Sequence, residues 1–223
     1  MRERGGGVLH AVLFDLDGLM ADSEPHSLAS WRAVLAARGV TLEQAVINQM
    51  FGQRLIETAH LLVERYRLPD SPAALAQEKE AYQVDHLKGR IRPMPGLFEL
   101  VEDIERLGLQ KAVASSGVRR YVTAVLDEIG LAGRFEAVIA GDDVAKGKPA
   151  PDIFLAAARA LGVDPRDCLV LEDAPAGVQA AHAAGMRCIA VPNAHTQGLD
   201  FSHADEVVVS LFAVRDILPQ FST

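Results

Sequence analysis

Two aspartates, Asp15 and Asp17, follow the first apolar run of the sequence and are separated by one leucine. Side chains two residues apart in extended backbone point to the same side, so both carboxylates would face one site. Two carboxylates at this spacing repel each other unless a cation lies between them. The pair therefore predicts a cation site, with a simple aspartate turn before Gly18 as the alternative.

Three later clusters of polar residues also follow candidate strands. Ser115 and Ser116 come after KAVA, Lys148 lies in the segment KGKPAPD, and Glu172 and Asp173 come after CLVL. Hydroxyls and backbone N–H groups at a strand-to-helix turn can bind an anion, although Ser-Ser-Gly is also an ordinary turn. Adjacent carboxylates after an apolar strand are costly unless they are solvated, hydrogen-bonded or bound to a metal.

The segment KGKPAPD contains two lysines, and we expect Lys148 to be the one that reaches the site. Pro149 lacks an N–H and restricts the preceding residue to extended backbone, from which the Lys148 side chain can reach back over the sheet edge. Lys146 is flanked by Ala145 and Gly147, so we expect it to be solvated.

Together these clusters supply four carboxylates, a lysine and an anion-binding turn. Oxygen ligands without nitrogen or sulfur suit Mg²⁺, which usually keeps several waters and is completed by the phosphate of a substrate. A carboxylate held near phosphorus can act as a nucleophile and form an acyl phosphate. The residue types therefore indicate phosphoryl transfer with a magnesium cofactor.

The elements that would position these residues alternate between strands and helices. Apolar runs predict strands that end at Phe14, Ser115, Gly141 and Glu172 and that lie in CIAVP (188–192) and EVVVS (206–210). Amphipathic segments between them, such as 96–108 and 118–130, predict helices that cover both faces of a parallel sheet. We expect an α/β fold with an open, Rossmann-like sheet, which binds ligands beyond the carboxyl ends of its strands.

The alternation stops between residues 23 and 92, where the sequence has helical patterns and no convincing strand. Glycines and prolines punctuate this stretch, and the segment PMPG (93–96) marks the return of the α/β pattern. We therefore expect a helical domain, 23–92, inserted after the first strand of an α/β core formed by 1–22 and 93–223.

Composition excludes several classes of function. The formal net charge of -8 argues against nucleic acid as a partner, because binding a phosphate backbone requires a basic face. The N-terminal apolar stretch is too short for a signal peptide, and no run approaches the roughly 20 apolar residues that span a membrane. We expect a cytoplasmic protein without a membrane partner. The sequence leaves its oligomeric state open.

The run FDLDGLMADSE (14–24) resembles the first signature of haloacid-dehalogenase-like hydrolases, in their phosphatase and phosphomutase branch. The order DLDG, VASSG, KGKPAPD and LEDAPAGVQAAHAAGM resembles the β-phosphoglucomutase-like subfamily over nearly the whole chain. The resemblance implies a catalytic α/β core, with the helical insertion as a cap, and Mg²⁺ as the cofactor.

The resemblance also implies a role for each core residue. Asp15 would attack phosphorus and bind Mg²⁺, and Asp17 would protonate the leaving oxygen, later accept a proton, and bind the metal through its backbone carbonyl. Ser115 and the N–H of Ser116 would hold phosphoryl oxygens, and Lys148 would neutralise them.

The remaining implied roles concern the metal and the substrate. Asp173 would complete the metal shell, with Glu172 binding directly or through water. Gly52, Gln53 and Arg54 are the cap residues that we expect to contact the substrate.

Within the subfamily, sugar mutases carry a histidine at the position of Ser27 and an arginine near Leu55. This sequence has His26 and Arg54 instead, each displaced by one residue. One step along a helix turns a side chain by about 100°, which points it away from the active site. We therefore predict a phosphatase that hydrolyses a small phosphorylated metabolite, with a sugar phosphate as the expected class, through an aspartyl phosphate.

Other functions remain as alternatives. A β-phosphoglucomutase-type sugar phosphomutase would return the phosphoryl group to a second hydroxyl. A phospho-accepting receiver domain also uses aspartates, a hydroxyl residue and a lysine, but it is much shorter and lacks both a cap and the Asp17 acid. True dehalogenases have no use for that acid or for magnesium ligands.

Overall fold

The computed structural model describes residues 8–50 and 54–221 of the chain. They belong to two compact units. The first, which we name the α/β unit, comprises residues 8–22 and 92–221 of the described chain, and the second, the helical unit, comprises Ser23–Ile91 without its undescribed residues. The assignment of these units as a catalytic core and a cap stays a prediction.

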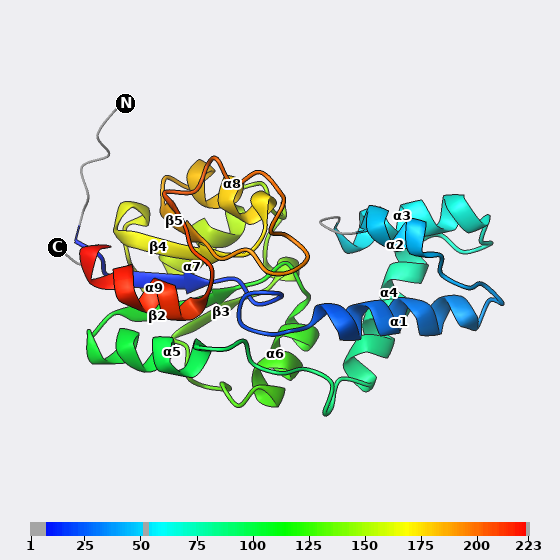
Figure 1. Ribbon diagram of the computed structural model, residues 1–223, viewed down its shortest axis with the longest axis horizontal. Coiled ribbons are helices and arrows are strands. Elements are labelled where there is room, and N and C mark those ends of the chain that lie inside the picture. Colours follow the sequence, from blue (N-terminus) through cyan, green and yellow to red (C-terminus); the bar gives the residue numbers. More distant parts are fainter. Residues whose placement is uncertain (1–7, 51–53, 222–223) are drawn as a thin grey trace. The chain divides into compact units, whose positions relative to one another are not determined.

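The α/β unit is built on a parallel sheet that has six strands in the described residues, in the order β3-β2-β1-β4-β5-β6. The strands are β1 (Ala11–Phe14), β2 (Gln110–Ala114), β3 (Ala137–Ile139), β4 (Cys168–Glu172), β5 (Arg187–Ala190) and β6 (Glu206–Val207). Each overlaps a run that the sequence predicts as a strand, and β2 and β5 begin one residue before their runs. The predicted fold class, α/β with an open parallel sheet, is confirmed (Figure 1).

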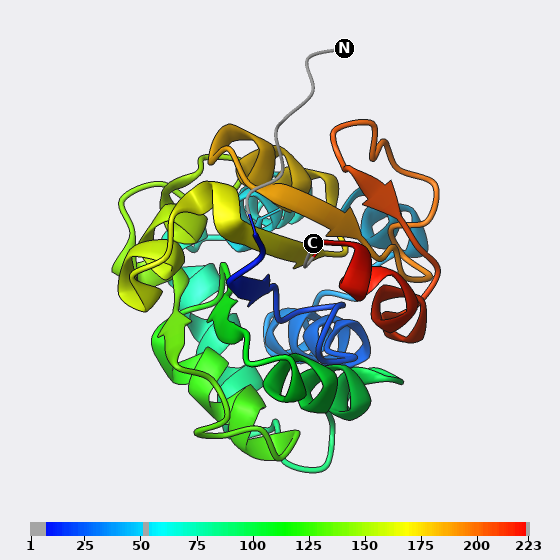
Figure 2. The same ribbon diagram turned by 90° about the vertical axis from the view of Figure 1, so that its left-hand side faces the viewer.

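Helices cover both faces of this sheet. They are α5 (Leu97–Arg106), α6 (Arg119–Glu128), α7 (Asp152–Leu161), α8 (Pro175–Ala183) and α9 (Leu211–Ile217), with short 3₁₀ turns η1 (Gly141–Asp143), η2 (Pro165–Asp167) and η3 (Leu218–Phe221). Helix α7 packs on β1, β2 and β3, and α8 packs on β4 and β5, whereas α5 packs on β2 and against α9. Figure 2 shows α8 on one side of the sheet and α5 and α9 on the other.

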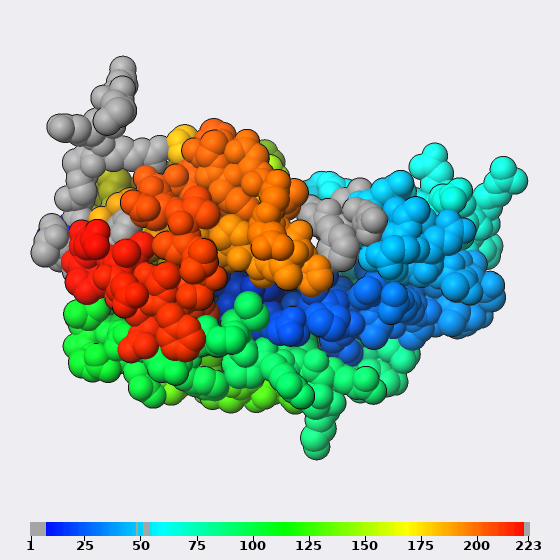
Figure 3. All heavy atoms as spheres, in the orientation of Figure 1, coloured from blue at the N-terminus to red at the C-terminus, as the bar shows by residue number. Residues whose placement is uncertain are grey.

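The side chains of β1 point alternately to the two faces of the sheet, and both faces are covered by helices. Ala11 and Leu13 belong to a buried cluster that includes Phe154 of α7 and Val178 of α8. Side chains alternate along a strand, so Val12 points to the opposite face, where α5 and α9 lie. These two helices are neighbours on the surface of the unit (Figure 3). The central strand is therefore buried on both sides, as its continuous apolar sequence predicts.

Four strands end earlier than the sequence predicts. β5 ends at Ala190 and β6 at Val207, before the ends of the runs CIAVP and EVVVS. β2 ends at Ala114 and β3 ends at Ile139, whereas the apolar runs predict ends at Ser115 and Gly141. The Oγ of Ser115 accepts a hydrogen bond from the Gly117 N–H at 3.1 Å. Such a local side-chain bond turns the backbone away from the extended conformation, which places Ser115 in a loop at the sheet edge.

The helical unit consists, in its described residues, of α1 (Glu24–Ala36), α2 (Gln44–Met50), α3 (Leu55–Tyr66) and α4 (Pro72–Asp85). Its own apolar core includes Trp31 and Leu35 of α1, Leu62 of α3 and Leu75 of α4. Among the helices of the described residues, none has the length and apolar character needed to cross a membrane.

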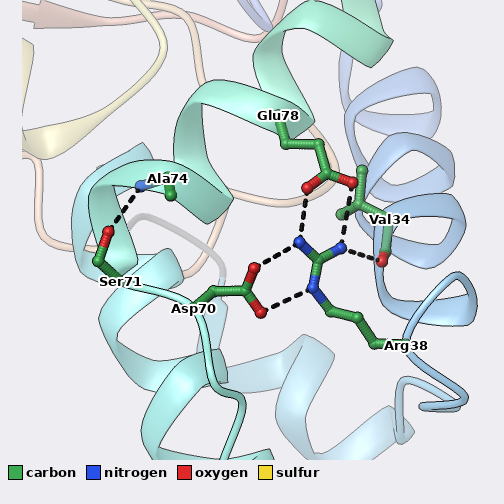
Figure 4. A network of polar contacts seen from close by, with 6 residues as sticks. All are labelled: Val34, Arg38, Asp70, Ser71, Ala74 and Glu78. Carbon is green, nitrogen blue, oxygen red and sulfur yellow. Dashed lines mark hydrogen bonds and ion pairs between the residues drawn. The ribbon is translucent and has the colours of Figure 1, made fainter.

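An ion cluster around Arg38 joins three segments of the helical unit (Figure 4). The guanidinium binds both carboxylate oxygens of Asp70, at 2.9 and 2.7 Å, and both of Glu78, at 3.1 and 2.5 Å. It also donates to the Val34 carbonyl at 2.7 Å. Because one planar fork satisfies two carboxylates and a carbonyl, the cluster fixes the end of α1 against α4.

Arg38→Lys should lower the midpoint of urea unfolding of the helical unit by about 0.5 M, because lysine cannot bind two carboxylates through a planar fork. Trp31, the single tryptophan of the chain, lies in this unit and supplies a fluorescence signal for its unfolding.

Arg65→Lys is the matched control, because Arg65 of the same unit forms an exposed pair with Glu43 through a contact of 3.1 Å. Exposed pairs contribute little to stability, so the control midpoint should stay close to that of the wild type. Equal midpoints for the two variants would show that the Arg38 cluster does not stabilise the unit.

Candidate active site

Asp15 is the first residue beyond the central strand of the sheet. Phe14 pairs with Val113 of β2 and with Leu171 of β4, and the Asp15 N–H donates to the Leu171 carbonyl at 3.0 Å. Strands on both sides therefore enclose its carboxylate, and only 7% of the residue is exposed. A buried carboxylate in this position requires a counter-charge.

Lys148 supplies that counter-charge. Its Nζ donates to Asp15 Oδ1, to Glu172 Oε1 at 2.6 Å and to the Ala114 carbonyl at 3.1 Å. The ring of Phe154 lies 4.9 Å from the same nitrogen. Three hydrogen bonds are as many as an ammonium group can donate, so the lysine side chain is fixed between the ends of β1, β2 and β4.

The two lysines of the segment KGKPAPD lie in different environments. Lys148 is 6% exposed and reaches the site, whereas Lys146 is exposed. The peptide bond between Lys148 and Pro149 is cis. Burial lowers the pKa of the Lys148 ammonium, but the charges of Asp15 and Glu172 outweigh this effect and raise the pKa overall. Lys148 is therefore a permanent cation in the site.

The end of β4 brings two more carboxylates to Asp15. Glu172 Oε2 accepts hydrogen bonds from the N–H groups of Asp173, at 3.0 Å, and Ala174, at 3.1 Å. Asp173 Oδ2 accepts a hydrogen bond from Nδ2 of Asn193 at 2.7 Å. Both oxygens of Glu172 are thus held, one by Lys148 and one by backbone.

Side-chain oxygens of Asp15, Glu172 and Asp173 lie within 4.8 Å of one another, and all three residues are buried. Burial raises the pKa of Asp15 to about 8, with Lys148 opposing this rise and Glu172 and Asp17 adding to it. Burial also raises the pKa of Asp173 well above its usual range. One lysine cannot balance this charge, and an all-oxygen donor set fits a divalent cation such as Mg²⁺.

The turn after β2 carries the predicted anion-binding residues. Ser115 is fully buried, and the side chain of Ser116 is exposed. Ser115 follows Ala114, whose carbonyl accepts a hydrogen bond from Lys148, so this turn adjoins the lysine. The arrangement suits a site in which Ser115 uses its hydroxyl and Ser116 uses its N–H.

The loop after β1 folds tightly against the end of β4. Gly18 has a φ of +80°, and a Cβ at this position would lie 2.6 Å from Asn193 Nδ2 and would also overlap the Asp173 carboxylate. Glycine is therefore required there. In the same loop Asp17 is half-buried, and its Oδ1 accepts a hydrogen bond from the Tyr121 hydroxyl at 2.5 Å.

Sequence reasoning did not identify Asn193 or Tyr121. Asn193 follows the apolar run CIAVP, so the rule that found Asp15 and Asp173, a polar residue just beyond an apolar strand, could have found it. Tyr121 lies within α6, where nothing in the sequence distinguishes it from a core aromatic residue.

Of the three predicted substrate residues, only Arg54 belongs to the described part of the helical unit. Gly52 and Gln53 fall outside the described residues. Arg54 immediately precedes α3, and its Nε donates to Glu57 Oε1 at 2.8 Å on the surface of the unit. A contact between these residues and a substrate stays a prediction.

His26 and Ser27, which are neighbours in α1, are both used for structure in this unit. His26 is buried, and its Nε2 lies 2.7 Å from the Gln83 carbonyl of α4. Burial lowers its pKa. Ser27 accepts a hydrogen bond from Lys79 Nζ at 2.9 Å, and this nitrogen lies 5.5 Å from the centre of the Trp31 ring. Both residues thus connect α1 to α4.

A family model described as haloacid dehalogenase-like hydrolase matches residues 12–191. The chain belongs to this family. The match contains all four sequence motifs, so the resemblance to haloacid-dehalogenase-like hydrolases is confirmed.

Individual proteins and solved structures are also similar to this chain. A fructose-1-phosphate phosphatase from Escherichia coli is 35% identical over 192 residues, which cover 86% of this chain and 98% of that protein. The structure of CbbY from Rhodobacter sphaeroides in complex with phosphate is similar with a TM-score of 0.80 and 28% identity, over 92% of this chain and 96% of that chain. β-Phosphoglucomutase from Clostridium difficile shares the fold, with a TM-score of 0.78, 24% identity and coverage of 96% and 97%.

Some family members are much longer. This chain spans 18% of the length of one relative from Arabidopsis thaliana, which is 41% identical, and 54% of the length of another, which is 34% identical.

Gly177→Ala should weaken the binding of Mg²⁺, used as the probe cation, about 10- to 100-fold. A Cβ at Gly177 in α8 would overlap the Glu172 carboxylate, so that carboxylate and the Lys148 bound to it must move. Alanine is about 1 kcal/mol better than glycine in a helix, so α8 itself should tolerate the change. Titration calorimetry measures the affinity.

Gly198→Ala is the matched control, because nothing lies within 4 Å of a Cβ at Gly198. Its Mg²⁺ affinity should equal that of the wild type. An unchanged affinity in Gly177→Ala as well would show that the position of Glu172 does not matter for the cation.

Proposed function

We propose that the protein is a magnesium-dependent phosphatase that hydrolyses a small phosphorylated metabolite, with a sugar phosphate as the favoured class. The observation that carries the proposal is the buried Asp15 carboxylate, held by Lys148 beside Glu172 and Asp173 at the carboxyl edge of the sheet. A nucleophile, a fixed cation and a cation-binding group thus lie together where open α/β sheets bind ligands.

Four residues would hold the magnesium ion. Asp15 and Asp173 would bind through their carboxylates and Asp17 through its backbone carbonyl, and Glu172 would bind directly or through water. When bound, the ion supplies positive charge that neutralises phosphoryl oxygens and orients them toward the nucleophile.

In the first half of the reaction, a carboxylate oxygen of Asp15 attacks phosphorus. The bond between phosphorus and the ester oxygen breaks, and its electron pair stays on that oxygen. Asp17 donates its proton to the same oxygen, so an alcohol leaves and an aspartyl phosphate remains on Asp15. The Ser115 hydroxyl, the Ser116 N–H and Lys148 hold the phosphoryl oxygens and stabilise the charge that develops on them.

In the second half, water attacks the aspartyl phosphate. Asp17, now a carboxylate, accepts a proton from the water, and the bond between phosphorus and Asp15 breaks. The electron pair of that bond returns to the Asp15 carboxylate. The sum of both halves converts a phosphate monoester and water into an alcohol and inorganic phosphate, and leaves both aspartates as they began.

In this scheme the α/β unit, predicted as 1–22 and 93–223, is the catalytic core, and the helical unit, predicted as 23–92, is a cap that selects the substrate. Support comes from the order of elements, because the helical unit is inserted between β1 and β2. We assign Gly52, Gln53 and Arg54 of the cap to substrate contact.

Hydrolysis is favoured over a mutase reaction by the contacts of His26. This residue is buried and its ring is bonded to the Gln83 carbonyl, so its side chain is not held ready for a sugar bisphosphate. The relative named as a fructose-1-phosphate phosphatase also supports a sugar phosphate as the substrate class. A receiver domain is disfavoured by the helical unit and by Asp17.

The test is a panel of fructose 1-phosphate, glucose 6-phosphate, β-glucose 1-phosphate and glycerol 3-phosphate, with release of inorganic phosphate as the measurement. We expect release in Mg²⁺ and loss of release in excess chelator. Asp15→Asn should lower the rate about 100-fold or more while the fold is kept, because the nucleophile is lost and the shape is unchanged.

Release of phosphate by Asp15→Asn at the wild-type rate would refute the assignment of Asp15 as the nucleophile. Full activity in excess chelator would refute the requirement for a metal ion. Conversion of β-glucose 1-phosphate to glucose 6-phosphate with little phosphate release would show that the protein is a mutase.

Lys148→Ala should lower kcat about 100- to 1,000-fold, because a fixed charge on the phosphoryl oxygens is lost. Lys146→Ala is the matched control and should change kcat less than about twofold, because an exposed lysine outside the site contributes little. Midpoints of thermal unfolding separate a loss of catalysis from a loss of folding. Equal losses in the two variants would show that Lys148 is not the catalytic lysine.

A further inference from the structure

A tyrosine hydroxyl contacts the residue to which the proposed reaction assigns both proton transfers. The Tyr121 Oη donates a hydrogen bond to Asp17 Oδ1 at 2.5 Å. Tyr121 is only 5% exposed, so its hydroxyl contacts a polar side chain from within the core. A bond from a neutral donor to a carboxylate is stronger than a bond between two neutral groups.

The position of the tyrosine ring is fixed by its surroundings. A Cβ at Gly117 would lie 2.7 Å from Tyr121 Cδ1, so the ring lies directly against the turn that follows β2. Tyr121 is in the first turn of α6, where the Arg119 N–H donates to Asp142 Oδ1 at 2.9 Å. Asp142 therefore anchors the start of the helix that carries the ring.

The hydroxyl consequently connects two loops whose relative position matters for the proposed reaction. Asp17 belongs to the loop after β1, and the Tyr121 ring lies against the phosphate-binding turn after β2. An acid must come within about 2.6 to 3.2 Å of the oxygen that it protonates. An aspartate side chain can adopt several rotamers. The hydrogen bond from the Tyr121 hydroxyl favours the rotamer that points the Asp17 carboxyl toward the turn after β2.

We infer that Tyr121 is a positioning residue for Asp17, which holds the acid–base carboxyl at the phosphate-binding turn. The inference rests on the proposed phosphatase function. When Asp17 is the neutral acid, the phenol donates to Oδ1 and the transferable proton is carried on Oδ2. The tyrosine exchanges no proton and touches neither phosphorus nor the leaving oxygen, so its effect passes through Asp17.

This role has a consequence that depends on the leaving group. An alcohol is a poor leaving group and requires a proton as its bond to phosphorus breaks. The para-nitrophenolate ion leaves as a stable anion and needs no proton from Asp17. The ratio kcat/KM reports the steps up to departure of the leaving group, so a misplaced acid should affect alkyl esters and spare this aryl ester.

Tyr121→Phe removes the hydroxyl and keeps the ring. For the sugar phosphate of the panel above that the wild type hydrolyses fastest, we expect kcat/KM to fall about 10- to 100-fold, part of the full effect of an acid catalyst. For para-nitrophenyl phosphate, kcat/KM should change less than about twofold, because departure of its leaving group needs no acid. Tyr66→Phe is the matched control, since the Tyr66 hydroxyl accepts a hydrogen bond from the Glu43 N–H in the helical unit, and it should change neither value.

A double-mutant cycle tests whether the effect passes through Asp17. In Asp17→Asn, addition of Tyr121→Phe should lower kcat/KM for the sugar phosphate no further. Equal losses on both substrates, a further loss in the Asp17→Asn background, or a Tyr121→Phe variant that does not fold would each overturn the positioning role. Failure of the proposed function looks different, because the wild type would then release phosphate from neither substrate.

Discussion

The candidate site depends on the ion pairs that the buried Lys148 ammonium forms with Asp15 and Glu172. The ammonium binds Asp15 and Glu172 together at the ends of two neighbouring strands, in a place where neither carboxylate could stay charged alone. Two glycines give room to the carboxylates at the end of β4. Gly177 leaves the volume that the Glu172 carboxylate fills, and Gly18 lets the loop after β1 approach Asp173. Glycine is thus needed at these two positions because a carboxylate lies close by, and at Gly18 also because of its positive φ.

Much of this site could be predicted from sequence because parallel strands end at a common edge. A polar residue directly after an apolar run must lie at that edge, which identifies Asp15, Ser115, Glu172 and Asp173 without any knowledge of long-range contacts. The choice of Lys148 over Lys146 required only the neighbouring proline. The same local rule placed all strands of the described sheet, but it set the ends of β2, β3, β5 and β6 one to three residues too late.

The contacts that sequence reasoning missed depend on the direction of side chains from distant elements. Tyr121 and Asp17 are 104 positions apart, and their contact depends on which face of α6 meets the loop after β1. Asn193 and Asp173 likewise meet only because the loop after β5 turns back over the end of β4. Periodicity gives the buried face of a helix, but it does not say which buried residue meets a polar partner. The side chains that contact the predicted site residues are therefore harder to predict than the site residues themselves.

We propose hydrolysis over transfer to a second hydroxyl on the basis of contacts inside the helical unit. His26 connects α1 to the Gln83 carbonyl of α4, and Ser27 beside it accepts a hydrogen bond from the buried Lys79. Turning α1 by one residue to present His26 at the position of Ser27 would break both contacts and would displace Trp31 from the apolar core. Buried polar groups that lose their partners cost about 1 to 3 kcal/mol each. The contacts that stabilise this unit thus oppose the arrangement that a mutase would require, and this favours water as the acceptor of the phosphoryl group.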